Sequence, residues 1–233
     1  MTPSTTSFCV LVPAYQEEAR VASTVKRLQA YASNVVVIDD GSSDRTAEVA
    51  REAGALVLRH EQNRGKGVAL QTGFDHAREQ GHELVITLDA DGQHDPAAIP
   101  EFLRTYEKTG LPVLIGNRMG DRVKMPFVRR CTNMFMSWLL SREIGQRVPD
   151  TQCGYRLYRC DVIPALSSEA PGYAAESEIL FHLARGGAKI GEVPLTAIYN
   201  DEESEIHPVR DTIRFFGMLR RLNRTDPGSS SQK

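Results

Sequence analysis

Residues 84–94, Leu-Val-Ile-Thr-Leu-Asp-Ala-Asp-Gly-Gln-His, join an apolar run to two carboxylates one residue apart. Apolar, β-branched residues favour a buried strand, and charge at the carboxyl end of such a strand predicts a site. Because successive strand side chains point to opposite faces, Asp89, Asp91 and Gln93 are expected to present oxygen atoms on one side. Oxygen ligands suit Mg²⁺ or Mn²⁺, which keep several waters and bind substrate phosphates. The competing interpretation is a polar turn that happens to carry two acids.

Strands and helices alternate along the first half of the chain. Hydrophobic periodicity predicts strands at 8–12, 35–39, 55–59, 84–89 and 113–116, and helices at 18–31, 44–53, 67–80 and 95–110. This order predicts an α/β fold with a mostly parallel sheet and helices on both faces. Polar side chains follow three of the strands, at residues 13–17, 39–42 and 89–91. Because ligands bind outside the carboxyl ends of such strands, these segments are expected to form one site.

The pattern changes after Gly116. Residues 125–144 are apolar but carry three arginines and the only tryptophan, Trp138. Further elements are predicted as a strand at 155–158, a helix at 175–185, a strand at 193–199 and a basic amphipathic helix at 209–223. The segment 125–144 and the last helix either pack on the core with solvated charges or form an interfacial surface for anionic lipid.

Length and composition bound the class of protein. The 233 residues, 41% hydrophobic and 25% charged, suffice for one domain, expected over 1–224 with a disordered tail at 225–233. A net charge of -2 argues against a protein that coats nucleic acid, so no nucleic-acid partner is expected. Neither a signal peptide nor a membrane span is expected, and the four cysteines form no C-x-x-C pair. These features favour a cytoplasmic protein with reduced thiols.

Two loop motifs follow other strands of the predicted sheet. Residues 39–46 open a helix, and Asp40 is the candidate for hydrogen bonds to a nucleobase or ribose; Ser43 and Asp44 are expected to cap the helix. Residues 63–67, Asn-Arg-Gly-Lys-Gly, place Lys66 just before a helix. There it suits a phosphate, and a pairing with a strand-end aspartate is the alternative. The chain contains neither a P-loop nor a G-x-G-x-x-G motif.

Two more motifs lie further along the chain. Gly116-Asn117-Arg118 places an arginine beside the predicted site, where it suits bidentate phosphate contact unless it is a solvated loop residue. Residues 150–156, Asp-Thr-Gln-Cys-Gly-Tyr-Arg, mix polar side chains with a glycine that allows close backbone approach. This segment is expected either to cradle an acceptor or to turn into the next strand.

Together these motifs resemble the family 2 glycosyltransferases of GT-A fold, especially their dolichyl-phosphate mannosyltransferase-like branch. The resemblance covers about residues 7–200 and rests on residues 12–18, 39–46, 63–69, 89–96, 116–118, 150–156 and 192–194. It implies a Rossmann-like nucleotide-diphospho-sugar transferase with Mg²⁺ or Mn²⁺ as cofactor. Residues 7–118 would hold the donor nucleotide and metal, and residues 119–224 would face the acceptor and the membrane.

The resemblance also assigns site residues. Asp91 and Gln93 match metal ligands, and the donor site takes Pro13, Tyr15, Glu17, Ile38, Asp40, Asp89, Ala90, Asp91, Gln93 and Arg118. The polyprenyl-phosphate head group takes Arg129, Arg130, Asn133 and Ser137. Lys66 joins the donor set, and Gln152 the acceptor set, through their own motifs. The branch's R-x-x-G-x-S-K motif is missing at 199–206, so Arg210 is the candidate replacement and completes a catalytic set with Asp91 and Arg118.

The implied activity is inverting, metal-dependent transfer of a hexose from GDP-mannose or UDP-glucose to a polyprenyl phosphate. A phosphate acceptor needs no strong base, whereas a hydroxyl acceptor needs a carboxylate such as Asp150, Glu176 or Glu178. The alternatives are a transferase for saccharide or protein hydroxyls and a peripheral membrane-binding module with a vestigial nucleotide-sugar pocket. A nucleotidyltransferase is disfavoured because residues 13–17 lack a glycine-rich, arginine-containing loop. The expected location is the cytoplasm, peripherally on the cytoplasmic membrane face.

Overall fold

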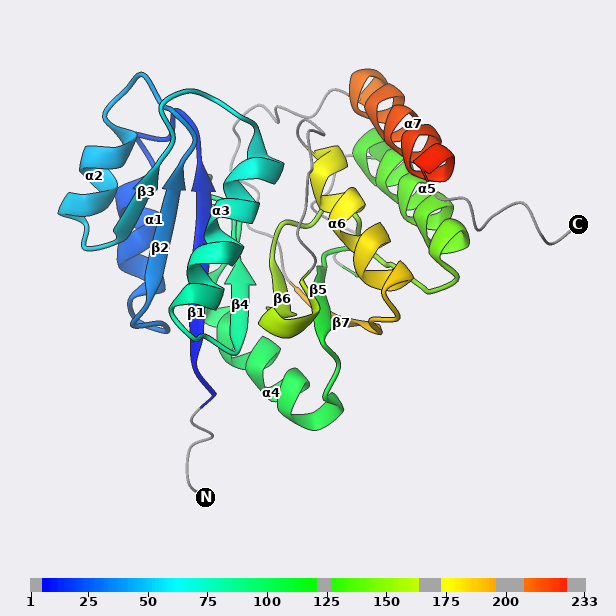
Figure 1. Ribbon diagram of the computed structural model, residues 1–233, viewed down its shortest axis with the longest axis horizontal. Helices are drawn as coiled ribbons and strands as arrows, with labels where there is room; N and C mark the ends of the chain where they lie inside the picture. The colour runs from blue at the N-terminus through cyan, green and yellow to red at the C-terminus, as the bar shows by residue number, and fades with distance from the viewer. Residues whose placement is uncertain (1–5, 121–126, 164–172, 196–207, 226–233) are drawn as a thin grey trace, which may run out of the picture.

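The computed structural model describes residues 6–120, 127–163, 173–195 and 208–225. Across these residues, seven strands form one sheet in the order β3-β2-β1-β4-β6-β5-β7 (Figure 1). The strands are β1 (Phe8–Ala14), β2 (Val35–Asp39), β3 (Leu56–Arg59), β4 (Leu84–Thr87), β5 (Val113–Asn117), β6 (Arg156–Arg159) and β7 (Ile190–Pro194). Their apolar side chains continue into one core, which explains why β2 and β4 are buried along their whole length.

Strand direction confirms the predicted mostly parallel sheet. β1 pairs in parallel with β2 and β4, β2 pairs with β3, and β5 pairs with β7. Only β6 runs the other way among the described strands, between β4 and β5. The carboxyl ends of β1, β2 and β4 therefore lie at one edge of the sheet, which is where the polar segments at 13–17, 39–42 and 89–91 were expected to meet.

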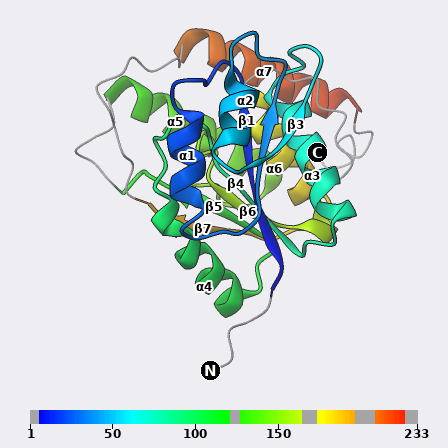
Figure 2. The ribbon, with the colours of Figure 1, turned by 90° about the vertical axis from the view of Figure 1, so that its left-hand side faces the viewer.

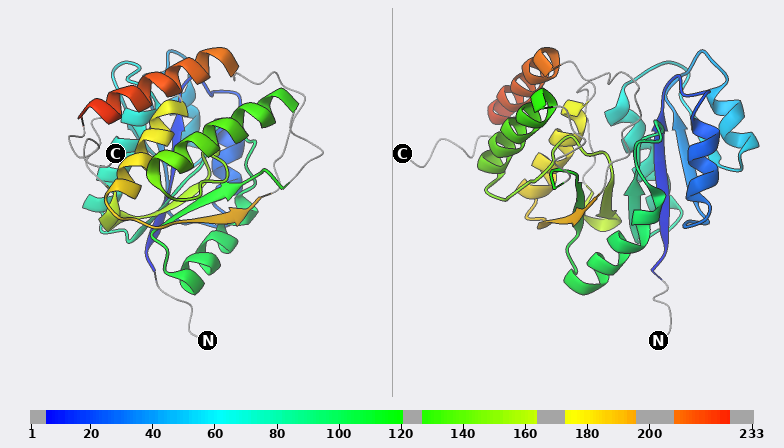
Figure 3. Two further views of the ribbon diagram at one scale, coloured as in Figure 1. Left: turned by 90° about the vertical axis from the view of Figure 1, so that its right-hand side faces the viewer. Right: turned by 180° about the vertical axis from the view of Figure 1, so that it is seen from behind.

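Helices cover both faces of the sheet, as predicted. Figure 2 shows α3 and α6 on one face and α1 and α4 on the other, while α2 packs against α1 and β3. The two remaining helices, α5 and α7, lie side by side against α6 (Figure 3). Helix bounds are α1 (Val21–Leu28), α2 (Thr46–Glu52), α3 (Lys66–Glu79), α4 (Ile99–Thr109), α5 (Phe127–Ile144), α6 (Tyr173–Arg185) and α7 (Pro208–Thr225), with short 3₁₀ turns η1 (Pro96–Ala98) and η2 (Cys160–Val162).

Element ends differ from the sequence predictions for local reasons. The first helix begins only at Val21 and ends at Leu28. Asp44, rather than Ser42 or Ser43, accepts a hydrogen bond from the Thr46 backbone at the start of α2. The predicted helix at 95–110 opens as a 3₁₀ turn capped by Asp95 and ends at Gly110 in the left-handed conformation.

Several predictions fall wholly or partly outside the described residues. The strand expected at 193–199 is observed as β7 up to Pro194, and residues 196–207, including the divergent segment at 199–206, lie outside the description. The tail from 226 onward also lies outside it. Within the described residues, no helix combines the length and apolar character that crossing a membrane requires. The four cysteines are free thiols.

Candidate active site

The loops after β1 and β2 are bound to each other at the carboxyl edge of the sheet. The backbone N–H of Gln16 donates to Ser42 Oγ at 2.9 Å, and that of Glu17 donates to Thr46 Oγ1 at 2.8 Å. These bonds hold Gln16 in a left-handed conformation, with φ 57°, which is uncommon outside glycine. The polar side chains of residues 42–46 thus shape the segment where Tyr15 and Glu17 were predicted to meet the nucleotide.

Tyr15 and Ile38 differ sharply in exposure. Tyr15 is the exposed ring of the predicted donor set, whereas Ile38 is fully buried in the sheet and Ala90 is buried beyond β4. Pro13 is partly buried within β1, and Glu17 forms an ion pair with Arg20. The geometry therefore leaves the Tyr15 ring exposed, where it can face a ligand, while Ile38 lies within the core of the sheet.

Asp39 and Asp40 at the end of β2 are buried and engaged by the protein itself. Asp39 pairs with Arg59 at 3.1 Å and accepts a hydrogen bond from the Ser42 backbone. Asp40 lies 2.7 Å from His60 Nδ1 and accepts hydrogen bonds from the backbone N–H groups of Arg64 and Gly65, at 3.0 and 2.7 Å. Asp40 therefore fixes the loop that precedes Lys66, in addition to the nucleotide contact predicted for it.

Asp89 lies beyond β4, between Lys66 and His94. Lys66 Nζ is 2.5 Å from Asp89 Oδ1, and His94 Nε2 is 3.6 Å from Asp89 Oδ2. Burial opposes ionisation of Asp89, but Lys66 and His94 outweigh it and hold the pKa of this carboxyl well below its usual range. The predicted alternative for Lys66, a pairing with a strand-end aspartate, is the arrangement observed.

Asp91 has the opposite electrostatic environment. Burial, and then the negative charge of Asp89, raise the pKa of Asp91 above its usual value. The alternation expected from an extended strand does not continue this far, because residues 90–92 turn and Gly92 has φ 74°. Asp91 Oδ1 accepts a hydrogen bond from the backbone of Gln93 at 2.9 Å, so this part of the predicted metal site is a turn.

A divalent cation fits this pair of residues chemically. Asp91 and Gln93 offer oxygen ligands, and the surroundings of Asp91 disfavour its negative charge, which a cation would offset. Within the described ranges, no three His, Cys, Asp or Glu side chains are grouped as a metal site. A cation held here would therefore take its remaining ligands from water and from substrate phosphate oxygens.

Gly154 brings the acceptor half of the chain against Asp89. A Cβ atom at position 154 would lie 2.5 Å from Asp89 Oδ2 and 2.9 Å from its Cγ. The backbone carbonyl of Gly154 also accepts a hydrogen bond from Thr87 Oγ1. The close backbone approach predicted for the glycine of segment 150–156 is therefore real, and the group it approaches is the donor-side carboxylate.

Arg118 and Asp150 form a buried bidentate ion pair. Arg118 Nε is 2.8 Å from Asp150 Oδ2, and its Nη2 is 3.0 Å from Oδ1. Asn133 Nδ2 donates to the same carboxylate at 2.7 Å. Burial opposes ionisation of Asp150, but Arg118 and Asn133 prevail and lower its pKa. Arg118 is thus not the solvated loop residue of the competing interpretation.

The predicted acceptor residues divide into buried and peripheral groups. Asn133, Ser137 and Gln152 are buried, and Ser137 bonds to Asn133 and Thr151 inside the interface between α5 and the 150–152 loop. Arg130 is partly buried on α5. The side chains of Arg129 and Arg210, both within helices, lie outside the described set. The geometry thus gives Asn133 and Ser137 internal partners, and their acceptor contacts stay predictions.

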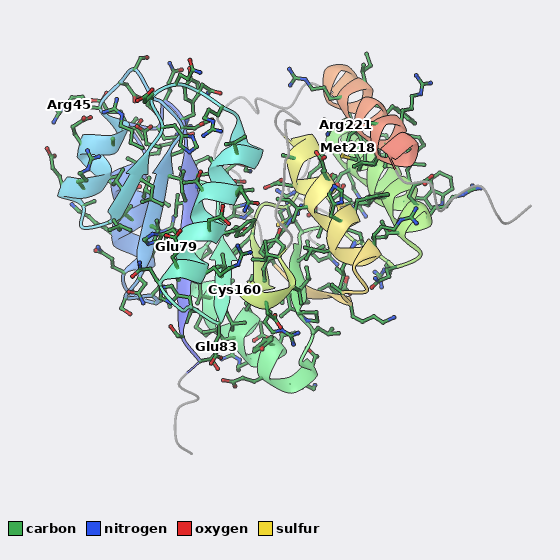
Figure 4. All side chains as sticks on the ribbon, viewed as in Figure 1. Arg45, Glu79, Glu83, Cys160, Met218 and Arg221 are labelled. Carbon is green, nitrogen blue, oxygen red and sulfur yellow. The ribbon has the colours of Figure 1, made fainter. Side chains whose placement is uncertain are left out.

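Helices α5 and α7 share an exposed apolar face, here called the α5–α7 face. Its side chains are Phe127, Val128, Met134, Phe135, Trp138, Ile213 and Phe216. Phe135 contacts both Trp138 and Phe216, with ring centroids 6.1 and 6.2 Å apart, so the face is continuous between the helices. Arg142 lies over the Trp138 ring at 5.9 Å. Elsewhere on α7, Arg221, which Figure 4 labels, binds Glu178 of α6.

Sequence reasoning missed two histidines of the site. His94 faces Asp89, and His60 holds Asp40 from the end of β3. His94 had a local signal, because it lies three positions after Asp91, whereas His60 had none, since Asp40 lies 20 positions away along the chain. Glu176 was a candidate base in the sequence, but its contact with Lys66, which Asp89 shares, was not foreseen.

Known proteins that are similar in sequence identify the family of this chain. Residues 9–166 match the family model described as glycosyl transferase family 2. An undecaprenyl-phosphate mannosyltransferase of Micrococcus luteus is 31% identical over 201 residues, covering 81% of this chain and 82% of that protein. A UDP-N-acetylglucosamine–dolichyl-phosphate N-acetylglucosaminyltransferase of Methanococcus voltae is 29% identical over 215 residues, covering 82% and 86%.

Solved structures agree on the fold. Glucosyl-3-phosphoglycerate synthase of Mycobacterium tuberculosis, crystallised with Mn²⁺, UDP and phosphoglyceric acid, superimposes with a TM-score of 0.72 at 21% identity. The match covers 97% of this chain and 81% of that one. The mostly parallel sheet, its edge of acids and the family match lead to one conclusion: the chain belongs to glycosyltransferase family 2 and has the GT-A fold.

Proposed function

We propose that this protein transfers a hexose from a nucleotide-diphosphate sugar to a polyprenyl phosphate, with inversion and with the help of a divalent cation. The observation that carries the proposal is the contrast between Asp89 and Asp91. Lys66 pairs with Asp89 and, together with His94, favours its ionised form, whereas the surroundings of Asp91 disfavour its charge. Asp91, whose charge is disfavoured, thus lies beside Asp89, whose charge is favoured. This combination suits a site that receives a cation together with a diphosphate.

The residues divide the work as follows. Asp91 and Gln93 would hold Mg²⁺ or Mn²⁺, which when bound neutralises the donor diphosphate and so stabilises it as a leaving group. Lys66 supplies a fixed positive charge next to Asp89. Tyr15 offers an exposed ring, and Asp40 keeps the loop before Lys66 in place. Arg118 is held by Asp150, so its charge is preorganised near the end of β5.

A phosphate acceptor agrees with the state of the candidate bases. Asp150 binds Arg118, Glu176 binds Lys66, and Glu178 binds Arg221. Burial opposes ionisation of Asp150, but Arg118 lowers its pKa, which makes it a weak base; Glu176 and Glu178 are each already held in an ion pair. A phosphate oxygen is already anionic and can attack the anomeric carbon opposite the leaving diphosphate without a base. This pairing gives the hydroxyl-acceptor alternative less support.

The α5–α7 face supports a location at a membrane surface. A lipid-linked acceptor has its phosphate at the membrane–water interface, so the enzyme must approach that interface. Aromatic and aliphatic side chains exposed on neighbouring helices, with arginines such as Arg142 beside them, suit contact with anionic lipid head groups. We place the protein on the cytoplasmic face as a peripheral protein.

The test is an incubation of the purified protein with polyprenyl phosphate and a panel of donors. GDP-mannose, UDP-glucose and UDP-N-acetylglucosamine are each supplied with Mg²⁺, with Mn²⁺ or with EDTA, and the lipid is analysed by mass spectrometry. We expect a cation-dependent mass increase of one sugar on the lipid phosphate with one donor. Cation-dependent release of the nucleoside diphosphate without any lipid product would instead favour a hydroxyl acceptor. Binding to lipid vesicles that neither donor nor cation alters, without turnover, would favour the non-enzymatic module.

A further inference from the structure

Lys66 connects the donor half of the molecule to helix α6. Its Nζ atom lies 2.5 Å from Asp89 Oδ1 and 2.8 Å from Glu176 Oε1. Lys66 is the first residue of α3, and the loop before it is fixed by the hydrogen bond from Gly65 to Asp40. Glu176 lies in the first turn of α6, so the lysine joins two elements separated by more than 100 residues.

Glu176 is buried between two positive groups. The residue is 2% exposed, and its Oε2 atom has no hydrogen-bond partner among the described residues. Arg156 Nη2 lies 3.9 Å from that oxygen, and Arg156 is itself fully buried. Glu176 therefore supplies negative charge next to Arg156 as well as next to Lys66, and a test of its role must separate stability from donor binding.

The fully buried Arg156 fixes the backbone around Glu176. Arg156 Nη1 donates to the Glu176 backbone carbonyl at 2.8 Å, and its other N–H groups donate to the carbonyls of Thr151 and Cys153. Glu176, the 151–153 loop and β6 are thus one rigid unit. The carboxylate of Glu176 consequently meets Lys66 from a fixed direction.

We propose that Glu176 is a positioning residue for the donor site and acts through Lys66. Asp89 and Glu176 both bind the ammonium group of Lys66. With two carboxylate partners from distant parts of the chain, the Lys66 side chain is restricted to one position and does not turn toward solvent. The ammonium then stays beside the strand-end acids where the donor diphosphate would lie. This inference rests on the proposed function and adds a residue that the family motifs do not include.

A double-mutant cycle over Lys66 and Glu176 tests the inference. Binding of UDP-glucose and of GDP-mannose in the presence of Mn²⁺ is measured by titration calorimetry for the wild type, Lys66→Met, Glu176→Gln and the double variant. We expect Glu176→Gln to weaken binding of the preferred donor about tenfold, and the double variant to bind within about threefold of Lys66→Met alone. Glu178→Gln is the matched control, because Glu178 is also buried but binds Arg221 instead of Lys66. The donor affinity of the Glu178→Gln protein should stay within about threefold of wild type.

Each outcome decides a separate question. Losses that add up in the double variant would overturn the inference, as would a Glu176→Gln protein with a lowered melting temperature but unchanged donor affinity. A wild-type protein that binds neither nucleotide sugar would overturn the proposed function itself. If Glu176→Gln does not fold, Lys66→Met/Glu176→Met removes both members of the Lys66–Glu176 ion pair and is compared with Lys66→Met; equal affinities support the inference, and a further loss contradicts it.

Discussion

The predicted donor half, residues 7–118, and the predicted acceptor half, residues 119–224, use their acids differently. In the donor half, Asp89 keeps a side-chain exposure of 20%, and the surroundings of Asp91 raise its pKa. In the acceptor half, Asp150 is fully buried and its pKa is lowered by Arg118 and Asn133. Both sets look like site residues in the sequence, but only the first retains charge that a ligand could satisfy.

The difference follows from how each half is built. Parallel strands end together, so their terminal side chains face outward at one edge of the sheet. The acceptor half consists largely of helices packed on one another, and its polar side chains hydrogen-bond to each other across the α5 interface. The main role of a polar residue in that setting is to stabilise the fold. Each half therefore needs a test that measures activity and stability separately.

The largest expected effect is the loss of activity in Asp91→Asn. Because folding raises the pKa of Asp91, its charge is unfavourable in the folded protein, and removing it should leave the melting temperature unchanged or slightly higher. Transfer should fall at least about a hundredfold, since the cation loses its carboxylate ligand. Initial rates and thermal unfolding measured on the same sample check this. Full activity in Asp91→Asn would remove the metal assignment.

In contrast to Asp91→Asn, Asp150→Asn should cause a large loss of stability. The substitution leaves the buried Arg118 without its counter-charge, so at neutral pH it should cost about 3–5 kcal/mol of unfolding free energy. Asp161→Asn is the control, because its ion pair with Arg159 is exposed and should contribute about 1 kcal/mol or less. Urea unfolding gives both values. A loss in Asp150→Asn as small as the control's would show that the buried pair does not stabilise the fold.

The same variant makes a prediction about pH. The folded-state pKa of Asp150 is lowered, so its stabilisation is complete above the unfolded-state pKa, about 4, and is lost as the pH falls through the folded-state value. The difference in unfolding free energy between wild type and Asp150→Asn should therefore be constant from about pH 5 to about pH 7. It should shrink below about pH 4. A difference that grows on acidification would contradict the ion pair.

Gly154→Ala probes the contact between the halves. The added Cβ would lie 2.5 Å from Asp89 Oδ2, so the carboxylate or the loop must move. We expect about 1–3 kcal/mol of destabilisation and an activity loss of about tenfold. Gly120→Ala is the control, because no atom lies within 4 Å of the corresponding Cβ. Equal activities for the two variants would mean that the position of Asp89 is not critical.

The smallest expected effect concerns the α5–α7 face. Trp138→Ala removes an exposed ring that contacts Phe135, and binding to anionic vesicles should weaken about threefold to tenfold. Tyr31→Ala removes an exposed ring of the donor half and should not change vesicle binding. Co-sedimentation measures both, and in the unmodified protein the fluorescence of Trp138 should shift to shorter wavelength on binding. Equal losses for the two variants would exclude a specific lipid-binding face.

The sequence predicted the fold of residues 7–118 well because the signals there are local. Alternating strands and helices gave the parallel sheet, and the residues after β4 gave the acids directly. The antiparallel direction of β6 was not predictable, since β6 pairs with strands far away in sequence. The contacts of Asp40 with His60 and of Lys66 with Glu176 were missed for the same reason, whereas the pairing of Lys66 with a strand-end aspartate was predicted. Charge state, which separates Asp89 from Asp91, depends on side chains that only the fold brings together.

The central claim is that the acceptor is a phosphate whose oxygen needs no base. The most direct measurement supplies polyprenyl phosphate and the matching polyprenol, which has a hydroxyl in place of the phosphate, in parallel with the preferred donor and Mn²⁺. Mass spectrometry of the lipids then reads the product. We expect a sugar on the phosphate lipid and none on the polyprenol. Transfer to the polyprenol at a comparable rate would contradict the claim.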